Sequence, residues 1–111
     1  MIPQRLTPEA ALQALASEPL GMRFLQVFQH GTLQVEIYKP VSRDLQRVHS
    51  RDEIYVVIAG HGEFVSPARC HAVGPGELLF AAAGVEHYFE NFSDDFCTWV
   101  VFYGPEGGET G

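Results

Sequence analysis

The sequence has few basic residues and no long apolar stretch. Lysine and arginine together number 7, against 14 aspartate and glutamate residues, which gives a formal net charge of −7. This balance repels phosphate backbones and anionic lipid, so we expect neither a nucleic-acid partner nor binding to a membrane surface. No segment approaches the roughly 20 apolar residues that span a bilayer. Polar residues and prolines interrupt the first nine positions, where a secretory signal needs an apolar run. We therefore expect a cytoplasmic location.

Cysteine is also scarce. Cys70 and Cys97 are the only two cysteines, and they do not have CxxC spacing. We interpret both as free thiols in a reducing compartment, with a disulfide between them as the alternative. The 111 residues, of which 46% are hydrophobic, have the length and composition of one globular domain. A domain this small buries a modest core, so dimerisation would be a natural way to bury more.

The N-terminal segment, residues 1–21, predicts one short packing helix. Thr7 is suited to the N-cap, Pro8 to the first helical position and Glu9 to the positive end of the helix dipole. An alanine- and leucine-rich stretch follows, and Glu18–Pro19 ends the helix. At the other end of the chain, we expect the glycine-rich residues 105–111 to form a flexible tail.

Residues 22–104 have a different character. Short segments rich in Val, Ile, Phe, Tyr and Leu alternate with breaks of Gly, Pro, Ser or Asp. The expected strands are Arg23–Gln29, Leu33–Tyr38, Glu53–Ala59, Gly62–Ser66, Ala68–Val73, Glu77–Ala81, Glu86–Phe92 and Thr98–Tyr103. Eight short strands with no helix between them predict an all-β antiparallel sandwich or barrel.

The strand that begins at Glu53 is apolar at every position from Ile54 to Ala59. A strand with this pattern is covered on both faces. One face can line a barrel interior, whereas the other needs a second sheet, the N-terminal helix or another subunit. The last of these alternatives favours a homodimer.

Three residues suggest a metal site. Glu53 shares its strand parity with Tyr55 and therefore points into the core, where a carboxylate is costly unless it is paired or bound to a metal. His49 lies four residues earlier. His87 falls in phase with Phe89 and Asn91 on a later strand. Two imidazoles and one carboxylate suit a borderline divalent ion, although each residue alone is more often a solvated loop or surface residue.

The stretch from His49 to Gly60 resembles the first cupin motif, HxHx(3,4)Ex(6)G, from its second histidine onward. The stretch from Gly76 to Asn91 resembles the second motif, Gx(5)PxGx(2)Hx(3)N, with Ala82 at the proline position. Asn91 to Glu106 is similar to the end of a bacterial group of small uncharacterised cupins. The resemblance implies a double-stranded β-helix, or jelly-roll barrel, over residues 22–104.

The resemblance also implies a ligand set. His49, Glu53 and His87 would hold one divalent ion, with Zn, Fe, Mn and Ni all compatible. Arg47 stands where the motif has its first histidine, and a guanidinium cannot ligate a metal. Arg47 either points to solvent, pairs with a nearby carboxylate, or binds an anionic group of a substrate beside the metal. Tyr55 and Phe89 would line the substrate pocket.

Three functions remain open on this basis. The first is a metal-dependent enzyme, a dioxygenase-like oxidoreductase or an isomerase, that acts on a small anionic molecule. The second is a non-catalytic sensor or storage module for a small molecule or metal. The third is a barrel that has lost its metal, which Arg47 and Ala82 favour. No separate nucleophile is visible, so in an enzyme the metal would carry the chemistry.

Overall fold

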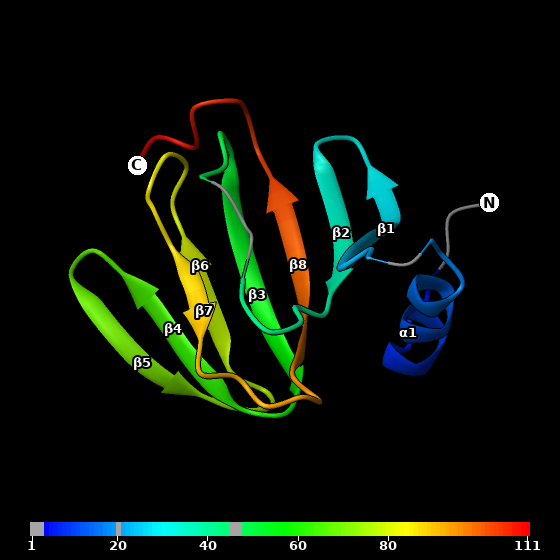
Figure 1. Ribbon diagram of the computed structural model, residues 1–111. Coiled ribbons are helices and arrows are strands. Elements are labelled where there is room, and N and C mark those ends of the chain that lie inside the picture. Colours follow the sequence, from blue (N-terminus) through cyan, green and yellow to red (C-terminus); the bar gives the residue numbers. More distant parts are fainter. Residues whose placement is uncertain (1–3, 20, 45–47) are drawn as a thin grey trace.

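The computed structural model describes residues 4–19, 21–44 and 48–111, and these form one helix and eight strands (Figure 1). In chain order the elements are α1 (Pro8–Ala16), β1 (Phe24–His30), β2 (Leu33–Tyr38), β3 (Asp52–Ala59), β4 (Gly62–Ser66), β5 (Arg69–Val73), β6 (Leu78–Ala81), β7 (Tyr88–Glu90) and β8 (Cys97–Tyr103). The predicted all-β architecture and the N-terminal helix are confirmed. The division of the chain at residues 21 and 104 stays a prediction.

Seven of the eight expected strands are found within one residue of their predicted bounds, but β7 is much shorter than the predicted Glu86–Phe92. The backbone of Val85 is occupied in the preceding turn, where its N–H donates to the carbonyl of Ala82 at 3.1 Å. His87 therefore precedes β7 and does not lie within it. At the other end, Asn91 has a left-handed backbone (φ 51°) that ends the strand. Asn91 is exposed, so the prediction that it shares an inward face with His87 and Phe89 is wrong.

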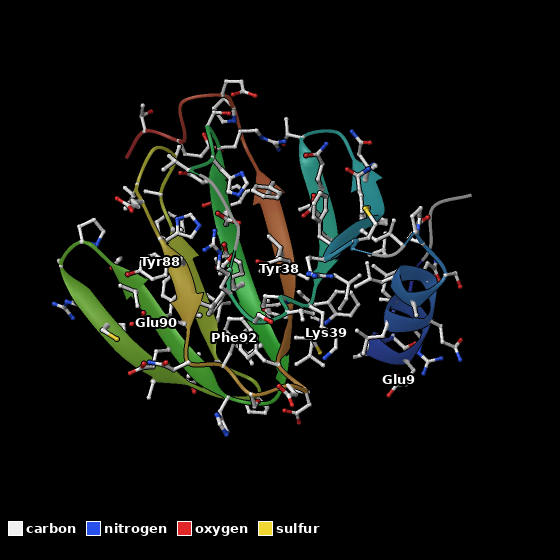
Figure 2. The ribbon with its side chains drawn as sticks, in the orientation of Figure 1. Glu9, Tyr38, Lys39, Tyr88, Glu90 and Phe92 are labelled. Atoms are coloured by element: carbon white, nitrogen blue, oxygen red, sulfur yellow. The ribbon has the colours of Figure 1, made fainter. Side chains whose placement is uncertain are left out.

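The strands form two antiparallel sheets. The larger sheet has the order β1-β2-β8-β3-β6 and the smaller has the order β5-β4-β7. The main core lies where the two sheets face each other, and it includes Tyr55, Phe64, Phe89, Phe96 and Val100. Figure 2 shows the side chains that fill this space. On β3, Glu53, Tyr55 and Val57 are all buried, as their shared parity predicts.

The helix covers one end of the outer face of the larger sheet. α1 begins as predicted: the Thr7 side chain accepts a hydrogen bond from the Ala10 amide at 3.2 Å, and Pro8 occupies the first helical position. Its buried residues Ala11 and Leu15 pack on Ile37, with Trp99 beside them. Figure 1 shows α1 beside β1 and β2, far from β5. No helix in the described part of the chain is long and apolar enough to cross a membrane.

The C-terminal residues fold back on the start of β3. The amide of Gly107 donates to the carbonyl of Ser50 at 2.7 Å, and the amide of Glu109 donates to Asp52 Oδ2 at 2.8 Å. Asp52 Oδ1 also accepts from the Ala83 amide at 2.9 Å. These amide donors lower the pKa of Asp52. Whether residues 105–111 move in solution stays a prediction.

Two glycines of the sequence motifs differ in how closely they are packed. Gly60 and Gly84 both have a φ of 78°, which favours glycine. A Cβ at Gly60 would lie 2.6 Å from Ser93 Oγ and 2.7 Å from the Phe96 backbone, whereas a Cβ at Gly84 would meet nothing within 4 Å.

We expect Gly60→Ala to cost at least about 2 kcal/mol of unfolding free energy, because steric overlap adds to the backbone strain. Gly84→Ala, the matched control, should cost about 1 to 2 kcal/mol from backbone strain alone. Urea denaturation of both variants checks this expectation. Equal losses would mean that the close approach at Gly60 relaxes without cost.

Candidate functional site

Glu53 is the most unusual side chain of the interior. It lies on β3 and is 0% exposed. Its Oε1 lies 2.6 Å from Nε2 of His87, yet neither carboxylate oxygen accepts a hydrogen bond of normal geometry. The contact is therefore a close electrostatic pair and not an aligned hydrogen bond. A buried carboxylate that lacks donors is costly, so this site favours a cation near Glu53.

His87 is held by the turn that precedes β7. Its Nδ1 lies 2.8 Å from the carbonyl oxygen of Val85 and its Nε2 lies 2.9 Å from the hydroxyl of Tyr55. A carbonyl only accepts, so Nδ1 carries the proton in the neutral ring and the lone pair of Nε2 faces the interior. A metal-binding histidine is oriented in the same way, with its other nitrogen donating to a carbonyl or carboxylate.

The pKa of His87 is set by opposing effects. Burial disfavours the imidazolium, but the close contact with Glu53, the Val85 carbonyl and the negative charges of Glu53 and Asp44 outweigh burial. The net result is a pKa above the ordinary histidine value. The site thus holds positive charge readily, as the excess of carboxylates around it requires.

His49 lies near this pair, in the segment that leads into β3. Its ring packs edge-to-face on Phe102 with centroids 4.9 Å apart, and its centroid lies 6.2 Å from that of His87. The carbonyl of His49 also accepts from the amide of Gly84 at 2.8 Å. This hydrogen bond ties the segment that carries His49 to the turn that carries His87.

The other sequence-predicted residues are placed differently. Tyr55 is buried and reaches the site through its hydroxyl contact with His87. Phe89 is 1% exposed and packs on Tyr55, with ring centroids 5.0 Å apart. Neither residue lines the cavity that opens beside His49, so their role in substrate binding stays a prediction. Arg47 lies outside the described residues.

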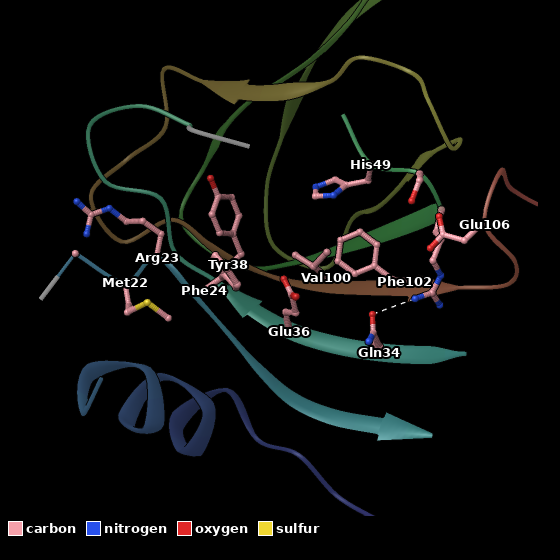
Figure 3. A pocket seen from close by; sticks show the side chains of 13 residues that line it. Met22, Arg23, Phe24, Gln34, Glu36, Tyr38, His49, Val100, Phe102 and Glu106 are labelled. Atoms are coloured by element: carbon pink, nitrogen blue, oxygen red, sulfur yellow. Dashed lines mark hydrogen bonds between the residues drawn. The ribbon is translucent and has the colours of Figure 1, made fainter. Parts of the chain in front are cut away.

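A cavity of about 710 Å³ opens beside His49 on the inner face of the larger sheet. Figure 3 shows that its walls combine apolar and charged side chains. The wall residues that matter most here are Arg23, Glu36, Tyr38, His49, Arg51 and Phe102. A cavity of this volume is large enough for a small organic molecule.

Glu36 is a cavity residue that the sequence reasoning missed. It lies on β2, where Gln34, Glu36 and Tyr38 alternate with Val35 and Ile37. Burial raises the pKa of Glu36, and repulsion from Glu53 raises it further. The alternation along β2 could have indicated that Glu36 faces a different side from Val35 and Ile37. The side that bears the apolar residues faces outward under α1, and the side that bears Glu36 faces the cavity.

A second group of possible ligands lies on the smaller sheet. Glu63, Cys70 and Glu90 come from β4, β5 and β7, and their ligand atoms all lie within 4.8 Å of one another. His49, Glu53 and His87 do not form so tight a group within the part of the chain that the structure describes. Glu63 is paired in register with Glu90, which explains the proximity of their carboxylates.

The chemistry of this second group is less suited to a metal. Cys70 is exposed, and both cysteines are free thiols as predicted. Desolvation by neighbouring groups and the charges of Glu63 and Glu90 raise the pKa of the Cys70 thiol, whereas metal binding requires the thiolate. The amide of Asn91 already donates to Glu63 Oε1.

Comparison with known proteins identifies relatives. A family model described as the Cupin domain matches residues 34–103. An uncharacterised protein of Streptomyces coelicolor is 31% identical over 85 residues, which cover 75% of this chain and 81% of the relative.

Solved structures show the same architecture. A protein of unknown function from Rhizobium leguminosarum has a TM-score of 0.67 at 18% identity, covering 94% of this chain and all of that one. A protein described as a putative mannose-6-phosphate isomerase from Ralstonia eutropha has a TM-score of 0.59 at 19% identity, covering 81% and 94% of the two chains. At these identities the likeness shows the fold.

Proposed function

This chain belongs to the cupin domain family, and from that premise we propose that it binds one divalent metal ion through His49, Glu53 and His87. The observation that carries the proposal is Glu53, which is fully buried and has two carboxylate oxygens without a hydrogen bond. A divalent cation would satisfy both oxygens and offset the cost of burying the charge.

The two histidines support the same proposal. The contact of His87 Nδ1 with the Val85 carbonyl directs Nε2 toward Glu53 and the Tyr55 hydroxyl. His49 approaches from the other segment, and its ring would have to move closer to join the other two. Two imidazoles and one carboxylate would leave further positions open to water or substrate. Zn, Fe, Mn and Ni are all compatible with these donors.

We further propose that the cavity receives a small anionic molecule. Arg23 and Arg51 both line it, and neither makes an ion pair with a carboxylate of a described residue. Arg51 instead donates to the carbonyl of Gly104 at 3.1 Å and to Gln34 Oε1 at 3.0 Å. In a chain with a net charge of −7, two arginines without acidic partners beside one cavity favour an anionic ligand. Arg47 stays a candidate for the same role.

The reaction, if there is one, is proposed as oxidation with dioxygen or as isomerisation. When bound, the metal would polarise a substrate oxygen or activate water or dioxygen. The chain would contribute the dry interior around Tyr55 and Phe89 and the orientation of the ligand by the cavity walls. The alternative is a non-catalytic module that holds the metal or the small molecule. Incubation of the metal-loaded protein with a panel of small carboxylates and sugar phosphates, followed by mass spectrometry, separates the two: turnover supports an enzyme, and binding alone supports the module.

We also propose that a second copy of this chain covers the rest of the outer face of the larger sheet. Leu78 and Phe80 on β6 are 63% and 54% exposed, and they lie in register with Val56 and Ile54 on β3. None of these four side chains is charged. Two copies that each carry a net charge of −7 can meet there without bringing like charges together.

The dimer proposal makes a simple prediction. Light scattering should give twice the chain mass of 12.3 kDa, and Phe80→Glu should give the monomer, because a buried unpaired carboxylate opposes association. Tyr88→Glu, an equally drastic change on β7 of the smaller sheet, is the control and should leave the dimer intact. A monomeric wild-type protein would refute the proposal.

A further inference from the structure

Glu36 lies on the face of the larger sheet that carries the interior site. In the larger sheet, Glu36 on β2 is in register with Val100 on β8, which is in turn in register with Tyr55 on β3. Alternate residues share a face, so Glu36 and Glu53 both lie on the inner face. Figure 3 shows Glu36 on the floor of the cavity, between Tyr38 and Phe102, with His49 on the opposite wall.

The Glu36 carboxylate has no partner among the described residues. It makes no hydrogen bond and no ion pair with any of them, although it is partly removed from solvent. Burial is the larger cause of the raised pKa of Glu36, and the negative charge of Glu53 is the second cause. The barrel interior thus contains two interacting carboxylates, and among residues 4–19, 21–44 and 48–111 no lysine or arginine is paired to either. A metal-free interior of this kind carries a repulsion that a divalent cation would relieve.

We propose that Glu36 supplies a second carboxylate ligand to the metal ion, so that two imidazoles and two carboxylates hold it. This inference rests on the proposed metal site at His49, Glu53 and His87. The added carboxylate makes the donor set richer in oxygen, which favours Mn²⁺ and Fe²⁺. Two carboxylates would also neutralise the ion, and recognition of an anionic ligand would then fall to the arginines of the cavity.

The test uses Co²⁺ as the probe, because its visible absorption reports the number and geometry of its ligands. Metal-free wild-type protein and Glu36→Gln are titrated with Co²⁺, and the affinity and the spectrum are recorded. We expect Glu36→Gln to bind Co²⁺ at least about 10-fold more weakly. Even the loss of a residue that only hydrogen-bonds to a metal ligand lowers metal affinity by about 10- to 100-fold. The spectrum should also change, because the coordination sphere loses an anionic carboxylate ligand.

Glu106→Gln is the matched control. Glu106 is an exposed carboxylate that lines the same cavity, so the variant removes the same charge without removing a proposed ligand. Equal affinity losses in the two variants with unchanged spectra would mean that Glu36 acts only through its charge, and this outcome overturns the proposal. Unchanged affinity in Glu36→Gln overturns it as well.

The failure of this inference can be separated from failure of the metal site itself. If the wild-type protein binds Co²⁺ and His87→Ala does not, the metal site stands, and the result for Glu36→Gln decides the role of Glu36 alone. If the wild-type protein binds no Co²⁺, both proposals fall together. Circular dichroism of each variant shows whether the β fold is retained.

Discussion

His87→Ala is expected to remove nearly all of the metal from the purified protein. Nε2 of His87 lies 2.6 Å from Glu53 Oε1 and faces the interior, so the variant removes a ligand at the centre of the proposed site. Loss of a residue that hydrogen-bonds to a metal ligand lowers metal affinity by about 10- to 100-fold, so loss of the ligand itself should lower it by at least about 100-fold. Elemental mass spectrometry of the purified proteins measures the effect, and the metal found in the wild type identifies the ion.

His49→Ala should give the same result, and His61→Ala is the matched control. His61 is exposed, in the turn between β3 and β4, so its loss should leave the metal content unchanged. Full metal occupancy in both His49→Ala and His87→Ala would refute the proposed ligand set. A wild-type protein that stays metal-free even after reconstitution would favour a barrel that has lost its metal.

Metal removal is expected to lower the stability of the wild-type protein substantially. At a free metal concentration about 100 to 1,000 times the dissociation constant, binding to the folded state adds about 2.7 to 4.1 kcal/mol to the free energy of unfolding. For a domain of this size, that corresponds to a rise in Tm of roughly 10 to 30 °C. Thermal denaturation with saturating metal and with a chelator measures the difference. Glu53→Gln should abolish it, because a neutral amide cannot replace the buried carboxylate as an anionic ligand.

Glu63→Gln distinguishes the two places where a metal could bind. Glu63 belongs to the group on the smaller sheet, with Cys70 and Glu90, and its loss should leave the metal-dependent rise in Tm intact. If Glu63→Gln abolishes the rise and Glu53→Gln does not, the metal binds on the outside of the smaller sheet. That result would contradict the site proposed here.

The strands of this fold could be predicted because their sequence patterns are local. The turn residues that separate them are strong signals, and β2 and β4 have the bounds that the sequence predicts. The inward direction of Glu53 followed from its parity with Tyr55 and Val57. The error at β7 arose where the backbone turns: the left-handed conformation of Asn91 ended a strand that the side-chain pattern continues.

The parts of the site that escaped prediction depend on contacts between distant segments. Glu36 becomes a site residue only because β2 pairs with β8 and β8 with β3. On β2 the outward face is the apolar one, because α1 covers it, and the polar face lines the cavity. Glu63 and Cys70 likewise meet through the pairing of β4 with β5. Periodicity within one strand contains no information about such neighbours.

The C-terminal residues have a practical consequence for the preparation of the protein. Gly107 and Glu109 are hydrogen-bonded to Ser50 and Asp52, which both lie in the short segment between His49 and Glu53. An affinity tag fused after Gly111, or a chain shortened to Tyr103, would disturb or remove these anchors within a few residues of two proposed ligands. An N-terminal tag, which joins the chain ahead of α1, leaves them untouched. Metal contents measured with tags at the two ends are therefore expected to differ, and the N-terminally tagged protein should retain more metal.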